Sequence, residues 1–126
     1  MHKHGMTDRQ KDQVYALLRE TYWADQLPRQ VFETSVANSL CRIILHKGEV
    51  VGFARAVTDH ATFTWICDVV VAREHRGKGL GTRLVSDILA HPDVAGAPAE
   101  LRTRDAHGFY IPLGFNPEVC MVWRPK

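Results

Sequence analysis

The sequence has 126 residues, of which 45% are hydrophobic and 24% are charged, and its formal net charge is +2. This length predicts a single domain over residues 1–126, and the composition excludes a disordered or collagen-like chain. The small charge excess argues against a nucleic-acid-binding protein. The apolar runs are too short for a membrane helix, which needs roughly 20 residues. Because the first five residues lack an apolar signal segment, we expect a cytoplasmic protein.

The cysteines and histidines do not indicate a metal centre. Cys41, Cys67 and Cys120 lie far apart among apolar neighbours, so we expect three core residues rather than a disulfide or zinc site. His2 and His4 could hold a metal loosely, but a frayed terminus is the simpler interpretation. We therefore predict no metal cofactor.

The pattern of apolar residues predicts alternating helices and strands. In chain order we expect a helix from Thr7-Asp8 to Tyr22, a short helix after Pro28 that includes Leu40, strands at 41–45, 50–57 and 62–71, a helix at 80–89 ended by His91-Pro92, a strand at 99–103, a helix or turn at 105–113, and a last strand at 120–123. This order predicts an α/β fold in which helices cover a mixed sheet.

A glycine-rich loop joins the longest predicted strand to the following helix. Its residues are Arg76-Gly77-Lys78-Gly79-Leu80-Gly81. A helix N-terminus offers free backbone N–H groups, and glycines let an anion approach them closely, so the loop is typical of a phosphate cradle; a tight turn is the alternative. The spacing of a P-loop is absent, and Thr82 stands where a dinucleotide fingerprint needs its third glycine.

Two motifs together resemble the GCN5-related N-acetyltransferases. Arg76-x-x-Gly79-x-Gly81 is similar to motif A of that family, and Tyr110-Ile111-Pro112-Leu113-Gly114-Phe115 resembles its Tyr-x-x-x-Gly-Phe signature. The resemblance spans nearly the whole chain and further resembles one bacterial branch of such acetyltransferases. It implies a central, mostly antiparallel sheet whose middle strands splay apart to admit acetyl-CoA.

The resemblance also implies where acetyl-CoA would bind. The pyrophosphate would lie on the backbone N–H groups of Arg76, Gly77, Lys78, Gly79, Leu80, Gly81 and Thr82. The pantetheine arm would pair with the strand edge at Val69, Val70 and Val71, where the N–H of Val70 or Val71 would stabilise the oxyanion formed at the acetyl carbonyl.

Two residues are candidates for proton transfer. Tyr110 matches the family tyrosine that protonates the departing thiolate, and a packed aromatic is the alternative. Asp68 stands in an apolar strand, where a carboxylate is costly unless it is functional or paired. It is predicted to act on the amine as a base or binding group, with a salt bridge to Arg55 as the alternative. The glutamate that many family members carry earlier on this strand is missing, so the base stays open.

Other residues are weaker candidates. His107 shares a helical face with Tyr110 and could touch the cofactor, although a surface histidine is the alternative. Asp105 could meet the pantetheine or cap a short helix. Candidates for the wall of the acceptor site are Tyr22, Trp23, Phe32, Arg55 and Trp65.

The predicted function is transfer of acetyl from acetyl-CoA to a primary amine of a small molecule or an exposed peptide. Direct attack in a ternary complex is expected, and a homodimer is possible. Two alternatives remain. One is a non-catalytic module that binds acyl-CoA as a sensor; the other is a nucleotide-binding regulator.

Overall fold

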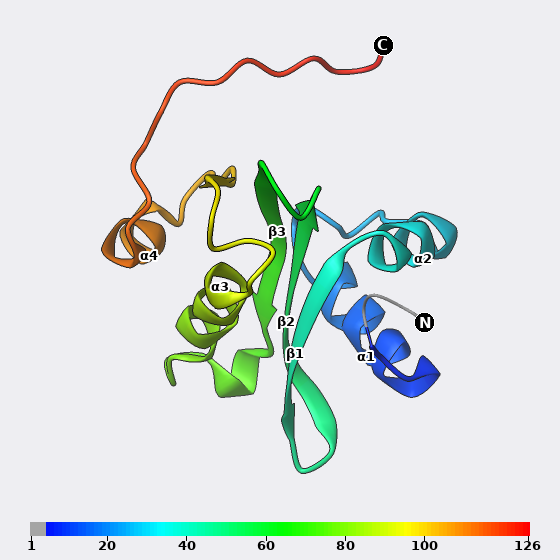
Figure 1. Cartoon of the computed structure of the whole chain (residues 1–126). Coiled ribbons are helices and arrows are strands. Elements are labelled where there is room, and N and C mark those ends of the chain that lie inside the picture. Colours follow the sequence, from blue (N-terminus) through cyan, green and yellow to red (C-terminus); the bar gives the residue numbers. More distant parts are fainter. Residues whose placement is uncertain (1–4) are drawn as a thin grey trace.

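The computed structural model describes residues 5–126. A four-stranded sheet lies at its centre, in the order β1-β2-β3-β4 (Figure 1). The strands are β1 (Leu40–His46), β2 (Glu49–Thr58), β3 (Thr64–Val71) and β4 (Ala99–Glu100). The first three are antiparallel, and β4 pairs parallel to β3 through only two residue pairs. The predicted mixed sheet is confirmed.

Helices cover both faces of this sheet (Figure 1). Helices α1 (Asp8–Arg19) and α2 (Arg29–Ala37) lie on one face, and α3 (Leu80–Ala90) lies on the other. A capping box between Thr7 and Gln10 starts α1, which satisfies backbone groups that a helix end leaves open. The short helix α4 (His107–Tyr110) lies on the α3 side.

The sheet separates two apolar cores. Phe32 and Phe53 belong to the core beneath α1 and α2, together with Val14, Leu18, Val36 and Val70. The core beneath α3 contains Leu84, Val85, Ile88 and Ile66. Helices α1, α2 and α3 therefore bury most of the apolar stripe by which the sequence predicted them. The predicted ends are wrong in two cases, because Tyr22 lies beyond α1 and Leu40 belongs to β1.

Phe53 offers a direct test of how much this packing contributes. Replacing Phe53, which is fully buried, with alanine is expected to lower the free energy of unfolding by about 3–5 kcal/mol, because the change leaves a cavity in the core. Phe63→Ala is the matched control, since that ring is 39% exposed and should cost much less. Denaturant unfolding measures both variants, and equal losses would contradict this account of the core.

A β-bulge interrupts β3 at Asp68. From Phe53 to Arg55 the β2 strand advances two residues, while its partner strand advances three, from Val70 to Cys67. Asp68 takes a left-handed backbone conformation with φ +57°, which is uncommon outside glycine, asparagine and aspartate. The extra residue moves Val70 to the opposite core from Ile66, although strict alternation would put both on one face.

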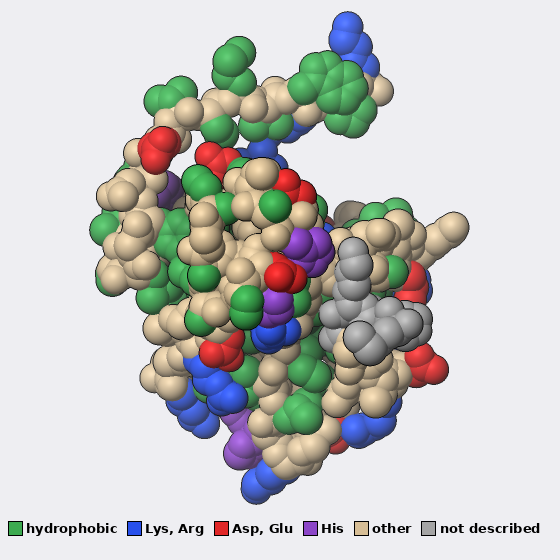
Figure 2. Space-filling model, in the orientation of Figure 1, with side chains coloured by type: hydrophobic (Ala, Val, Ile, Leu, Met, Phe, Trp, Pro, Cys, Tyr) green, Lys and Arg blue, Asp and Glu red, His purple; other side chains and the backbone are tan. Residues whose placement is uncertain are grey.

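The C-terminal part departs from the sequence expectation. The strand expected at 99–103 is shorter, ending at Glu100, and the strand expected at 120–123 is wrong. Residues 116–126 run away from the body of the protein without helix or strand (Figure 1). Apolar side chains of this segment stand free in Figure 2; Val119 is 100% exposed and Met121 is 98% exposed. A short apolar run does not by itself form a strand when no partner strand lies beside it.

The cysteine expectation is also wrong in one case. Cys41 is buried and Cys67 half-buried, but Cys120 is exposed because it lies on the free C-terminal segment. His2 and His4, considered above as loose metal ligands, lie outside the described residues. Between residues 5 and 126, no helix is long and apolar enough to cross a membrane.

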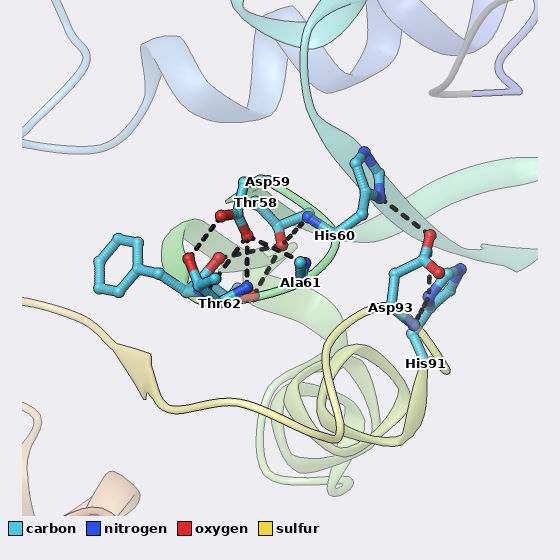
Figure 3. Close-up of polar contacts among 9 residues, drawn as sticks. Thr58, Asp59, His60, Ala61, Thr62, His91 and Asp93 are labelled. Atoms are coloured by element: carbon cyan, nitrogen blue, oxygen red, sulfur yellow. Dashed lines mark hydrogen bonds and ion pairs between the residues drawn. The ribbon is translucent and has the colours of Figure 1, made fainter.

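The turn between β2 and β3 is held by polar contacts (Figure 3). The Asp59 carboxylate accepts hydrogen bonds from the Thr62 hydroxyl and from the backbone N–H groups of Thr62 and Ala61. These hydrogen bonds, that of the Thr62 hydroxyl above all, hold the pKa of the Asp59 carboxyl well below its usual range. The neighbouring His60 Nδ1 lies 2.8 Å from an Asp93 carboxylate oxygen. These contacts tie the turn to the loop after α3, away from the glycine loop.

Candidate active site

The glycine loop adopts a conformation that leaves its backbone accessible. Gly77 and Gly79 have φ of +80° and +78°, and Gly79 forms the N-terminal cap of α3. A Cβ atom added at either glycine would meet no atom within 4 Å, so open space lies where a side chain would otherwise stand. Arg76 Nε donates a hydrogen bond to the Val71 carbonyl at 3.0 Å, which fixes the loop to the end of β3. The loop therefore presents free N–H groups and the positive end of a helix dipole.

This loop opens into a cavity of about 870 Å³, called here the loop cavity. It runs along β3 and is walled by the loop after α1 and by α4. The lining residues include Tyr22, Trp23, Val69, Val70, Val71, Arg76, Gly77, Gly79, Leu80, Gly81, Thr82 and Asp105. The structure thus brings together most of the residues that the sequence assigned to a cofactor, but Lys78 does not line this cavity.

Among residues 5–126, no strand lies beside β3 on the cavity side beyond its short pairing with β4. Pairing with β4 ends at Trp65, so residues 66–71 are not paired on that side. Unpaired strand edges offer N–H and C=O groups that an extended ligand can bind. The edge therefore suits a chain-like ligand that carries amide groups.

Sequence reasoning missed Phe109. Its ring lies against Gly81, where a Cβ atom would stand 3.2 Å from Phe109 Cζ. A side chain at position 81 would press on this ring, because α4 packs on α3 here. Phe109 also lines the loop cavity. Its place directly before Tyr110 was the available signal.

Tyr110 faces a second cavity. This one has a volume of about 560 Å³, and Trp65 and His107 line it with Tyr110. Phe109 and Tyr110 lie edge to face, with ring centroids 4.9 Å apart, so α4 contributes one aromatic ring to each cavity. Burial raises the pKa of the Tyr110 phenol, which keeps it protonated at neutral pH.

Asp68 is engaged on both carboxylate oxygens. Arg55 Nε lies 2.9 Å from Oδ2, and the Trp23 indole donates to Oδ1 at 3.1 Å. Arg55 also donates to the Ser39 hydroxyl. The salt bridge considered from the sequence is therefore present, and it connects the sheet to the loop that carries Trp23. Action of Asp68 as a base stays a prediction.

The loop after α1 also contacts the loop before α4. The Arg104 guanidinium lies 4.0 Å from the centre of the Tyr22 ring, and that ring lies edge to face against Trp23. Tyr22 is 53% exposed and Trp23 is 47% exposed. These two aromatics line the loop cavity, and their part in acceptor binding stays a prediction.

The remaining candidates are divided between the site and the core. Phe32 is fully buried beneath α1 and α2, so its predicted place on an acceptor wall is wrong. Arg55 lines neither cavity, and its guanidinium pairs with Asp68. The predicted cap by Asp105 is not formed; Thr103 instead accepts the hydrogen bond of the Ala106 N–H. No group of three metal-ligating side chains is found in the part of the chain that the structure describes.

Comparison with known proteins identifies the family. The model of the Acetyltransferase (GNAT) family matches residues 6–115. This chain belongs to the GNAT family. The fold that the resemblance implied is confirmed.

Individual GNAT relatives agree with this assignment. A protein of the GNAT family from Xanthomonas campestris pv. campestris is 34% identical in sequence, with a TM-score of 0.83 over 91% of this chain and 86% of that chain. GCN5-related N-acetyltransferase 2, chloroplastic, of Arabidopsis thaliana is 38% identical over 85 residues, which are 62% of this chain and 33% of the relative. The match thus spans about a third of that protein's length. The fold is also similar to an aminoglycoside 6'-N-acetyltransferase solved with coenzyme A, at 24% identity, covering 72% of this chain and 53% of that one, with a TM-score of 0.60.

Asp68→Asn tests the role of the ion pair in this GNAT chain. Asparagine tolerates the left-handed backbone, but Arg55, whose side chain is 17% exposed, would lose its counter-charge. The free energy of unfolding is expected to fall by about 3 kcal/mol, because a largely buried charge would be left unpaired. Asp87→Asn, on the exposed side of α3, is the control. Denaturant unfolding measures both, and similar stability for the two variants would contradict a structural role for the pair.

Proposed function

We propose that this chain transfers the acetyl group of acetyl-CoA to a primary amine of a small molecule or an exposed peptide. The observation that carries the proposal is the glycine loop at the N-terminus of α3, which opens into a cavity along the unpaired edge of β3. Family membership supports the same conclusion.

The residues present suit acetyl-CoA. The open space at Gly77 and Gly79 admits a pyrophosphate to the backbone N–H groups, and Arg76 and Lys78 supply positive charge beside it. Val69, Val70 and Val71 offer the strand edge for the amide groups of the pantetheine arm. Asp105 lines the same cavity, whereas His107 lies in the second one.

Acetyl-CoA would supply an activated acetyl thioester, and the protein must handle two protons. The attacking amine must lose one, and the departing thiolate must gain one. We assign the second task to Tyr110, because burial keeps its phenol protonated. We assign the first task to Asp68 or to water. Water is included because both oxygens of the Asp68 carboxylate already accept hydrogen bonds.

Two of the three cysteines, Cys41 and Cys67, are unsuited to forming a covalent acetyl-enzyme. Burial raises the pKa of Cys41 to about 12 and that of Cys67 to about 11. A thiol must ionise to act as a nucleophile, so neither is active at neutral pH. Neither of these two thiols therefore competes with direct transfer in a ternary complex.

A non-catalytic acyl-CoA sensor is the second candidate. It is favoured by one observation: Tyr110 faces the second cavity rather than the loop cavity. The sensor would bind acetyl-CoA without releasing CoA in the presence of any amine.

A two-step experiment separates these functions. Thermal shifts are first measured with CoA, acetyl-CoA, ATP and NAD; a ligand at 100 times its Kd stabilises by about 2.7 kcal/mol. A library of amines is then screened for CoA release from acetyl-CoA. A shift with CoA compounds and amine-dependent release supports the enzyme, a shift without release supports the sensor, and a shift only with ATP or NAD would refute both.

Two further expectations belong to this proposal. A homodimer and a cytoplasmic location stay predictions from the sequence. Sedimentation of the purified chain at several concentrations tests the dimer, and fractionation of expressing cells tests the location.

A further inference from the structure

Arg104 stacks on Tyr22, which lines the loop cavity, although Arg104 is not itself a lining residue of that cavity. Arg104 is exposed, and among residues 5–126 it forms none of the ion pairs found. Its guanidinium is held over the Tyr22 ring at 4.0 Å. A guanidinium stacked on an aromatic ring keeps its N–H edge open, and that edge matches a carboxylate with two parallel hydrogen bonds.

A continuous set of contacts fixes the position of this arginine. Arg55 pairs with Asp68 in the sheet, Asp68 accepts from the Trp23 indole, and the Trp23 ring lies against Tyr22. The Arg104 guanidinium in turn stacks on the Tyr22 ring. The stack is thus anchored to β2 and β3, so little freedom would be lost when Arg104 binds a ligand.

The position along β3 assigns Arg104 to the acceptor rather than to the phosphates. The glycine loop follows the C-terminal end of β3, whereas the contacts that hold Arg104 start at Asp68, near the middle of the strand. Positive charges also lie at the glycine-loop end, on Arg73, Arg76 and Lys78. The phosphates therefore have cations of their own.

We propose that Arg104 binds a carboxylate of the acceptor, so that the preferred substrate is an amine that also carries a carboxylate, as an amino acid does. This inference rests on the proposed acetyl transfer and names its substrate class.

The test compares amino acids with their amides. Glycine, β-alanine and lysine are each paired with the corresponding C-terminal amide, and kcat/KM is measured by CoA release at saturating acetyl-CoA. Acid and amide differ in amine pKa, so the informative quantity is the acid-to-amide ratio compared between enzyme variants. Arg104→Gln is expected to lower this ratio about 10- to 100-fold, mainly through KM of the acid, because a charge-assisted hydrogen bond is lost.

Two further variants and one binding measurement sharpen the test. Tyr22→Phe keeps the ring and should keep the ratio, whereas Tyr22→Leu removes the platform and should lower it. Arg124→Gln changes an exposed arginine on the C-terminal segment and serves as control. The Kd of CoA should be the same in the unaltered enzyme and in Arg104→Gln.

Several outcomes would overturn the inference. An unchanged ratio in Arg104→Gln, or weaker CoA binding in that variant, would assign the arginine elsewhere. If amides and simple diamines are acetylated but acids are not, the proposed acetyl transfer stands and only this inference fails. If no amine is acetylated, the same pairs are tested by thermal shift with CoA bound, and equal shifts for acid and amide would still refute carboxylate binding.

Discussion

Tyr110→Phe is expected to lower kcat by about 10²- to 10⁴-fold while leaving the Kd of acetyl-CoA nearly unchanged. The change removes one hydroxyl, and general acid catalysis by one positioned group contributes a factor of this size. Because burial raises the pKa of the Tyr110 phenol, the unaltered enzyme should lose this acid only in strongly alkaline solution. Steady-state kinetics give kcat, and calorimetric titration gives the Kd.

The matched control is Tyr15→Phe. The Tyr15 hydroxyl donates to the Leu27 carbonyl at 2.6 Å, and the residue lines neither cavity. Its loss should affect stability but not kcat. If Tyr110→Phe turns over at the same rate as the unaltered chain, Tyr110 is only a packed aromatic residue. Its ring centroid lies 4.9 Å from that of Phe109 and 5.6 Å from that of Phe115, which fits such a role.

Gly79→Ala is expected to weaken CoA binding about 10- to 100-fold. At φ +78° an alanine is strained by roughly 1–2 kcal/mol, and its Cβ would enter the space through which a phosphate reaches the backbone of the loop. Losing one hydrogen bond to a charged group produces a factor of this size. Titration calorimetry with CoA measures the effect.

Gly48→Ala separates strain from binding. Gly48 has φ +80° in the turn between β1 and β2, and a Cβ added there would meet no atom within 4 Å. Both variants should therefore lose similar stability, whereas only Gly79→Ala should lose affinity for CoA. Equal CoA affinity in the two variants would refute the glycine loop as a phosphate cradle.

Local features of the sequence determined the helices, the first three strands and the glycine loop. Helix α3 could be predicted from its apolar stripe and from the glycines before it, because both signals lie within a few residues of one another. The same holds for the β1–β2 hairpin, whose turn is Lys47-Gly48. The loop cavity could be located from the sequence because the glycines and Val69–Val71 are neighbours along the chain.

Contacts between distant segments decided the rest. The bulge at Asp68, its contacts with Arg55 and Trp23, and the stacking of Arg104 on Tyr22 join residues up to 82 positions apart, and no short pattern encodes such distances. The predicted strand at 120–123 failed for the same reason: a strand exists only through a partner's hydrogen bonds. The sequence by itself therefore determined the glycine loop and the acetyltransferase resemblance. Only the tertiary structure decided which distant side chains surround the loop cavity, because those side chains meet through packing of the folded chain.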